Sequence, residues 1–295
     1  MIDESLKLIG DMPVLVEPTL IVVLGGWIDA GAAAANAVSA INAESETTPF
    51  AEFDDDVYVD YRARRPTMEL RDGLHTVLNW ERIVLSAGSD QTGRDLIVLS
   101  GPEPDTAWHR FSRAVGDLAK HLGVTQMAHL GAYPFAVPHT RPTRLSVSSP
   151  SEDVLARVKF LRSSLDVPAG IAAALERELH DRGIPSLGIW AQVPHYSASG
   201  LFPAASAALL DGLREATGLV IDAPGLRSDA MEHAKRLDAM IASNEEHSRM
   251  IGQLEELYDS TDDSVEVIGG GGPSLEMLTG DQIAAELEQF LRDQD

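Results

Sequence analysis

The chain has 295 residues, a hydrophobic fraction of 44% and a formal net charge of -23 at pH 7. This charge disfavours general binding to nucleic acid or to anionic membranes, because both need a basic protein surface. Cysteine is absent, which excludes disulfides, thiolate metal sites and cysteine nucleophiles. The sequence has no apolar run of about 18 residues and no signal-peptide pattern at its start, so we expect a cytoplasmic protein.

The first part of the chain alternates between predicted strands and helices. Residues 19–25 form a continuous apolar run, which is typical of a strand buried on both faces, and Asp29 then precedes an alanine-rich helix. Further strands are predicted at 82–86, 95–100, 124–131 and 186–193, and further helices at 105–122, 170–182 and 203–217. Asp105 is the expected N-cap of the first of these helices. The alternation predicts an α/β fold in which helices cover a mostly parallel sheet on both faces.

The pattern becomes purely helical after about residue 222. Apolar residues recur at helical spacing over 228–259, a run of four glycines at 269–272 predicts a turn or linker, and a last helix is expected at 280–292. We therefore interpret residues 1–222 as an α/β body and residues 223–295 as a C-terminal helical appendage.

The segment 53–66, FDDDVYVDYRARRP, concentrates opposite charges around a short apolar stretch. Alternation predicts a strand there, with Val57 and Val59 on one face and Tyr58 on the other. In one interpretation Asp54 and Arg62 belong to a site whose arginines bind a carboxylate or phosphate. In the other, the arginines pair with the neighbouring aspartates, within the monomer or across a subunit interface.

Polar residues also follow the predicted strands. The glycine-rich segment 25–31 is a candidate anion site at a helix N-terminus or a purely structural turn, and Asp29 would compete for the same amides. Glu103, between two prolines, is placed for a general acid or base at the carboxyl edge of the sheet, or belongs to a stiff turn. In the loop 138–142, His139 suits proton transfer and Arg141 suits anion binding; the alternative is an interface loop.

Other chemistries lack their motifs. The histidines have no paired spacing typical of a metal site, and no Gly-x-Ser-x-Gly elbow predicts a serine hydrolase. We therefore expect neither a metal ion nor a cofactor.

Four motifs, GGWIDAG, FDDDVYVDYRARRP, LSGPEPDTAWHRF and GAYPFAVPHTRP, occur in this order. Together they resemble the actinobacterial branch of the proteasome assembly chaperone 2 family over roughly residues 12–222, as does the closing AAELEQFLR at 284–292. The resemblance implies a phosphorylase/hydrolase-like α/β fold and a homo-oligomer, with a trimer expected, but no activity. The final Asp293-Gln294-Asp295 departs from the aromatic or apolar tail of the eukaryotic chaperone.

Three hypotheses follow. The first is an oligomeric binding or assembly protein, able to bind another protein, with a cleft for a small anionic ligand at the carboxyl edge of the sheet. The residues placed in that cleft are Asp29, Asp54, Arg62, Glu103, His139 and Arg141. The second is a phosphorolytic or hydrolytic enzyme acting on a nucleoside-like substrate, with Glu103 or His139 as acid or base and Arg62 with Arg141 as anion clamp. In the third, the charged segments are trimer contacts.

Overall fold

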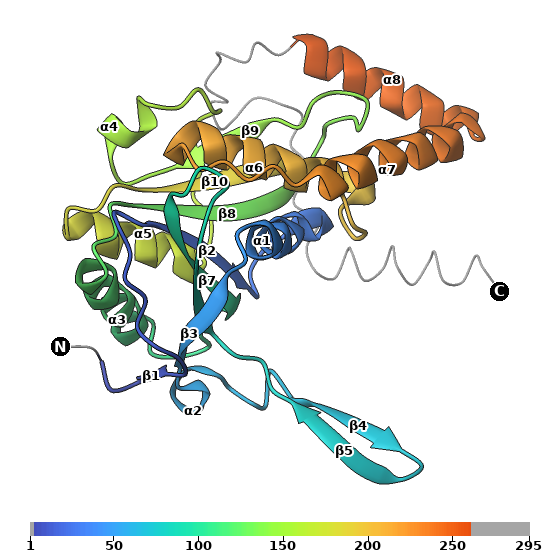
Figure 1. Ribbon diagram of the computed structural model, residues 1–295. Coiled ribbons are helices and arrows are strands. Elements are labelled where there is room, and N and C mark those ends of the chain that lie inside the picture. Colours follow the sequence, from blue (N-terminus) through green and yellow to red (C-terminus); the bar gives the residue numbers. More distant parts are fainter. Residues whose placement is uncertain (1–2, 261–295) are drawn as a thin grey trace.

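The computed structural model describes residues 3–260, and an eight-stranded sheet forms its centre (Figure 1). The strands in spatial order are β1 (Leu6–Leu8), β3 (Thr48–Phe53), β6 (Val84–Ser89), β7 (Asp95–Pro102), β2 (Thr19–Gly25), β8 (Gln126–Phe135), β10 (Ser186–Pro194) and β9 (Leu145–Ser148). The four central strands, from β7 to β10, run parallel, whereas both margins pair antiparallel. The predicted α/β fold is confirmed, and the antiparallel margins are an addition to it.

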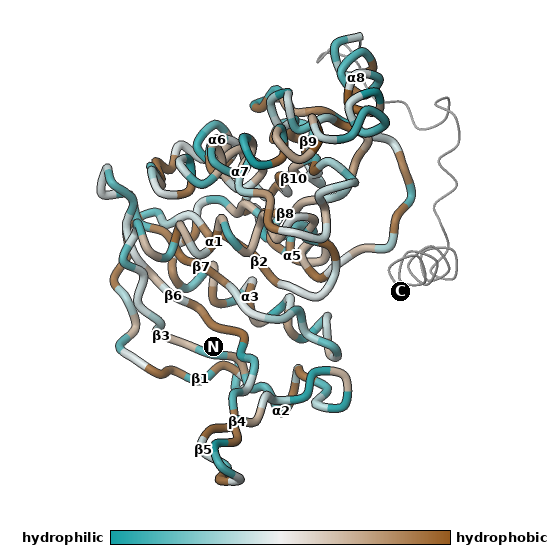
Figure 2. Tube along the Cα trace, turned by 90° about the vertical axis from the view of Figure 1, so that its right-hand side faces the viewer, coloured by the Kyte–Doolittle hydropathy of each residue, from teal (hydrophilic) through white to brown (hydrophobic). Residues whose placement is uncertain are grey.

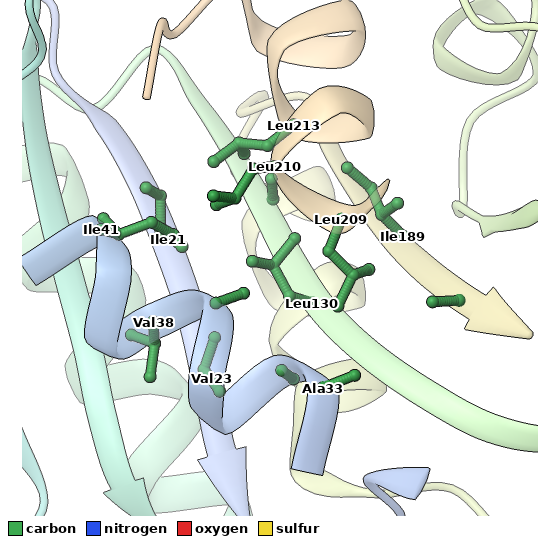
Figure 3. Packing of buried hydrophobic residues seen from close by; sticks show 14 of the residues in the cluster. Ile21, Val23, Ala33, Val38, Ile41, Leu130, Ile189, Leu209, Leu210 and Leu213 are labelled. Carbon is green, nitrogen blue, oxygen red and sulfur yellow. The ribbon is translucent and has the colours of Figure 1, made fainter. Parts of the chain in front are cut away.

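Helices cover both faces of this sheet. α1 (Ala33–Glu44) and α6 (Pro203–Thr217) pack on one face, and α3 (Trp108–His121) and α5 (Ile171–Asp181) on the other. Side chains alternate along a strand, so β2 sends Ile21 and Val23 to the first core and Leu20 and Val22 to the second. Figure 3 shows the first core, where leucines of α6 meet β2, β8 and β10. Short helices lie at Ala30–Ala32 (η1), Glu152–Leu155 (α4) and His195–Ser197 (η2).

Two further helices follow the last strand, α7 (Pro224–Ala242) and α8 (Glu245–Ser260). α7 packs against α6 and buries Leu226 in the first core, and Figure 1 shows α8 doubling back from the far end of α7. The helices predicted within 228–259 are therefore confirmed. The glycine run at 269–272 and the helix at 280–292 lie outside the described residues, and the division at residue 222 stays a prediction. None of the helices within 3–260 is long and apolar enough to cross a membrane.

The predicted strand around Tyr58 is wrong, because the segment forms the short helix α2 (Asp55–Tyr58). The Asp54 carboxylate accepts the N–H of Asp56 at 3.2 Å, and two further aspartates occupy the first turn. Consecutive carboxylates favour a helix N-terminus over a strand. They accept hydrogen bonds from the free amides there, and their negative charge interacts favourably with the positive end of the helix dipole. The ring of Tyr58 is buried edge-on against Phe53 and Phe111, so an aromatic core contact fixes the end of this helix.

The prediction that Asp105 caps the following helix is also wrong. α3 begins at Trp108, with Ala107 as its N-cap. Asp105 instead accepts the backbone N–H of Asp60 at 2.8 Å and the Nε–H of Arg64 at 3.0 Å. The apolar side chains of Phe111, Val115 and Leu118 in α3 and of its C-cap Leu122 are buried.

A separate antiparallel hairpin, β4 (Thr67–Arg71) and β5 (Leu74–Asn79), projects from the body (Figure 1). Every residue of β5 is exposed, and Figure 2 shows hydrophobic stretches along the hairpin, outside the main body. The sequence patterns did not predict this hairpin, which begins directly after the segment 53–66.

Candidate functional site

At the carboxyl edge of β2 and β7, two predicted ligand-binding carboxylates hold helix N-termini. The carboxylate of Asp29 accepts the N–H groups of Ala34 at 2.8 Å and Ala35 at 2.9 Å, at the start of α1. Glu103 Oε2 accepts the N–H of Ile171 at 3.1 Å, at the start of α5. Both positions supply unpaired amides and the positive end of a helix dipole. Asp29 therefore occupies two amides at the helix N-terminus that follows 25–31, where an anion was proposed to bind.

Arg64 reaches this edge, and it does so because Gly26 has no side chain. Gly26 adopts a φ of +131°, and a Cβ there would lie 2.5 Å from Nη2 of Arg64 and 3.1 Å from Cγ of Glu103. Because Gly26 has no side chain, the side chains of Arg64 and Glu103 can both lie against the end of β2. Arg62 is exposed and has no ion pair within residues 3–260, although its backbone N–H donates to the Asp60 carboxylate at 2.9 Å.

Asp54 lies apart from this edge, in the segment that carries α2. Besides capping α2, its carboxylate pairs with Lys7 Nζ at 3.2 Å. Neither interpretation of segment 53–66 anticipated these partners, because Asp54 and Arg64 each pair with a residue outside it, Lys7 and Asp105. A ligand-binding role for Asp54 and Arg62 stays a prediction.

The loop after β8 places His139 beneath α7. Its ring is 2% exposed, with Nδ1 at 2.8 Å from the hydroxyl of Tyr196 and Nε2 at 3.1 Å from Asp238 Oδ1. That hydroxyl also accepts the backbone N–H of His139, so its own hydrogen is free to donate to Nδ1, and Nε2–H donates to Asp238. Burial raises the pKa of Tyr196 to about 12, so this hydroxyl keeps its proton at neutral pH.

Arg141 binds the facing carboxylates of α8. Its Nε and Nη2 form a fork with Asp259 at 2.9 and 2.7 Å, and Nη1 donates to Glu255 at 3.0 Å. The hydrogen bonds that Arg141 donates to Asp259 are the main reason why the pKa of Arg141 is raised, and the guanidinium in turn lowers the pKa of Asp259. Thr140 also donates to Glu255. We call His139, Thr140 and Arg141, with their partners Asp238, Glu255 and Asp259, the polar clasp, because it ties the loop to α7 and α8.

The hairpin carries an exposed apolar face that no other element within residues 3–260 covers. Met68 pairs with Leu78 across the two strands, and alternation places Leu70 on the same side. These three side chains, the apolar hairpin face, are between 37% and 51% exposed. The opposite face carries Glu69, which accepts hydrogen bonds from Arg71 and Asn79. A two-stranded hairpin alone is only marginally stable in water, which favours a protein surface as its partner.

A buried polar cluster lies on the α5-facing side of the sheet, among residues that the sequence patterns did not single out. Glu176 of α5 is 5% exposed, and its carboxyl lies 3.3 Å from Ser148 Oγ and 3.9 Å from His129 Nδ1. The Nε1–H of Trp190 donates to Ser148 Oγ at 3.3 Å. Burial raises the pKa of Glu176 to about 8 and lowers the pKa of His129 to about 4. Both groups are therefore neutral at pH 7 and do not form an ion pair.

Two strand glycines make room for this cluster. A Cβ on Gly188 would lie 2.7 Å from Glu176 Oε1, and a Cβ on Gly131 would lie 2.5 Å from the ring of Trp190. The signal in the sequence was a glutamate on the apolar stripe of the predicted helix 170–182, four residues after Ala172 and three before Leu179. Within residues 3–260, no group of three histidine or carboxylate side chains could hold a metal ion.

The fold and these surfaces define an α/β protein with a mixed central sheet and a projecting hairpin. The helices α7 and α8 form a helical arm that the polar clasp ties to the loop after β8. Residues 23–241 match the PAC2 family, and the chain belongs to that family. The resemblance inferred from the motifs is thereby confirmed.

Solved structures agree with this assignment. A protein of unknown function from Corynebacterium glutamicum is 33% identical, with a TM-score of 0.82, over 88% of this chain and 98% of that one. A PAC2 family protein from Streptomyces avermitilis is 30% identical, with a TM-score of 0.72, over 79% and 99%. A proteasome-assembly chaperone homologue from Mycobacterium tuberculosis is 28% identical, with a TM-score of 0.73, over 79% and 99%. Among curated proteins there is no significant match.

If the polar clasp fixes α8, Arg141→Gln will loosen that helix. The substitution removes the charge and the fork to Asp259, so amide hydrogen exchange in α8 should become several-fold faster while α6 keeps its protection. Arg249→Gln, an exposed arginine of α8 without an ion pair within 3–260, is the matched control. Equal α8 exchange in the two variants would contradict the clasp.

The buried cluster predicts that stability falls as the pH rises toward the pKa of about 8 of Glu176. The pKa of Glu176 is raised from 4.5 to about 8, so the folded state retains a proton that the unfolded state has released, and stability falls as pH rises through this window. The slope reaches at most about 1.4 kcal/mol per pH unit. His129 acts oppositely, but its effect is confined to pH below its ordinary pKa of 6.5.

Urea unfolding at intervals from about pH 6.5 to 8.5 isolates the Glu176 contribution. Glu176→Gln should flatten the decline, and Glu256→Gln, an exposed glutamate of α8, should retain it. A Glu176→Gln profile as steep as that of the wild type would show that the carboxyl ionises normally in the folded state.

Proposed function

We propose that the protein is a cytoplasmic, oligomeric assembly protein that binds other polypeptides in a chaperone-like manner. The observation that carries the proposal is the apolar hairpin face, which is held outside the body and exposed. Membership of the PAC2 family supports it, as does the similarity to a proteasome-assembly chaperone homologue. Exposed apolar patches that are rimmed by polar residues are typical of protein-binding surfaces.

The occupant that we propose for the apolar hairpin face is another copy of this chain. The body has further exposed apolar side chains, among them Trp27, Ile28, Leu165 and Val167, and the side chain of Trp27 lies beside Gly170. A projecting element that docks on a different surface of the next copy makes a heterologous contact, and such contacts form a ring when the rotation between copies closes. Three copies are the number that we propose. A net charge of -23 repels neighbouring copies, so the contact depends on apolar burial.

The contacts favour assembly over the enzyme alternative. Of the two acid–base candidates, Glu103 accepts a helix amide, and both ring nitrogens of His139 have hydrogen-bond partners. The anion clamp needs two available guanidiniums, whereas that of Arg141 binds two carboxylates. A ligand cleft at the carboxyl edge remains a prediction, and its best position is around Gly26, where Arg64 and Glu103 meet.

The double substitution Met68→Lys with Leu78→Glu tests the self-association. The new side chains face each other across the strands, so their opposite charges support the hairpin while the apolar hairpin face is removed. The wild type should sediment as a defined oligomer at micromolar concentration, and the variant as a folded monomer with an unchanged far-ultraviolet spectrum.

The matched control is Met231→Lys with Met240→Glu, which changes two exposed methionines of α7 in the same way. This control should remain oligomeric. A hairpin variant with the sedimentation profile of the wild type would remove the apolar hairpin face from the proposal.

The assembly function predicts a second polypeptide bound at a fixed ratio. Native mass spectrometry of the protein, purified gently from its own cytosol, should show the oligomer with this polypeptide, and the monomeric hairpin variant should lose it if the ring forms the binding surface. A bare oligomer under every growth condition would contradict the assembly of other proteins, and it would leave the self-association intact.

A further inference from the structure

A cavity of about 330 Å³ opens between α5 and the end of β9. The residues that line it are Ser148, Ser149, Pro150, Ala173, Glu176 and Arg177. Its volume falls within the range of roughly 300–1,000 Å³ that is usual for small-molecule sites. The cavity lies beside the edge strand β9, and it shares no residue with the hairpin or the polar clasp.

The floor of the cavity is built at a cost in stability. Burial of a carboxyl is unfavourable unless its hydrogen bonds are satisfied, and within residues 3–260 Glu176 has only Ser148 Oγ, at 3.3 Å from each oxygen. His129 Nδ1 lies behind it, buried and without a hydrogen-bond partner in the described part of the chain. The sheet also gives up a side chain at Gly188 to admit the carboxyl. Buried polar groups that lower the stability of the folded chain are often found at functional sites.

The mouth of the cavity carries a positive charge. Arg177 follows Glu176 directly, is exposed, and makes no ion pair with any residue between 3 and 260. The chain has 46 acidic and 23 basic side chains, so this guanidinium stands out against an acidic background. A guanidinium offers forked N–H donors, and a protonated carboxyl offers an O–H donor. Together they match an oxygen-bearing anion, provided that Glu176 keeps its proton.

We propose that this cavity binds a small organic molecule through an oxyanion head group, with Arg177 at the mouth and the carboxyl of Glu176 at the floor as its donors. The head group is a carboxylate or a phosphate, since both present the same acceptor oxygens. Deprotonation of Glu176 places a negative charge beside the ligand, so binding weakens as pH rises.

Thermal unfolding and calorimetry with inorganic phosphate, and separately with short monocarboxylates, test the site in the full chain. One of the two probes should raise the unfolding temperature at pH 6.5, because a ligand that binds only the folded state stabilises it. The probe that causes no shift carries the head group that the cavity does not bind. The affinity should fall at pH 8.5. If neither probe binds at millimolar concentration, the proposal is overturned.

Three variants separate binding from a purely structural role. Glu176→Gln keeps a neutral donor, so it should bind at pH 6.5 like the wild type and lose the pH dependence. Arg177→Gln should weaken binding about tenfold, the usual loss for a charged hydrogen bond. Lys120→Gln, at an exposed position of α3 outside the cavity, should have no effect. Unchanged affinity in Arg177→Gln, or lost affinity in Glu176→Gln at pH 6.5, would overturn the assignment.

Discussion

The structure depends on a parallel centre whose strands are buried on both faces. β2 has apolar side chains on both sides and hydrogen-bonds to β7 and β8, so no face of it can meet water. Helices must therefore cover the sheet twice, and each crossover helix begins near the carboxyl edge of the parallel strands. Unpaired amides gather at that edge as a result. The sheet uses Asp29 and Glu103 to satisfy them, which explains why carboxylates follow its strands.

This use of charge changes how polar motifs are to be interpreted in such a fold. Strand-end carboxylates and arginines resemble a ligand cleft in the sequence, yet the most ordered ones here have protein partners. Arg141 forks onto α8 and His139 lies between Tyr196 and Asp238, so the loop after β8 works as an attachment point for the helical arm. The attachment is largely polar, and only Ile251 and Leu254 of α8 are buried. The position of α8 therefore depends on geometry and charge more than on a hydrophobic core.

The regular part of the fold was predictable because local and tertiary preferences agree there. The run 19–25 is apolar on both faces, and the helix 203–217 was predicted with its observed bounds. Prediction failed where a local hydrogen bond overrides the alternation of side chains, as when Asp54 caps α2. The hairpin was missed because its apolar side chains face outward, so no core constrains their pattern. Glu176 was overlooked because one polar residue on an apolar stripe is visible only once the facing Gly188 is known.

The two proposed surfaces follow from opposite departures from one rule. Folding places apolar groups inside and charged groups outside. The apolar hairpin face exposes what the rule would bury, on a projecting element that another polypeptide can cover. Glu176 buries what the rule would expose, beside a cavity whose volume of about 330 Å³ suits a small molecule. Each departure lowers the stability of the isolated chain, and in each case a bound partner would restore that stability. The proposed partners differ in size because one surface is an exposed face and the other is a cavity.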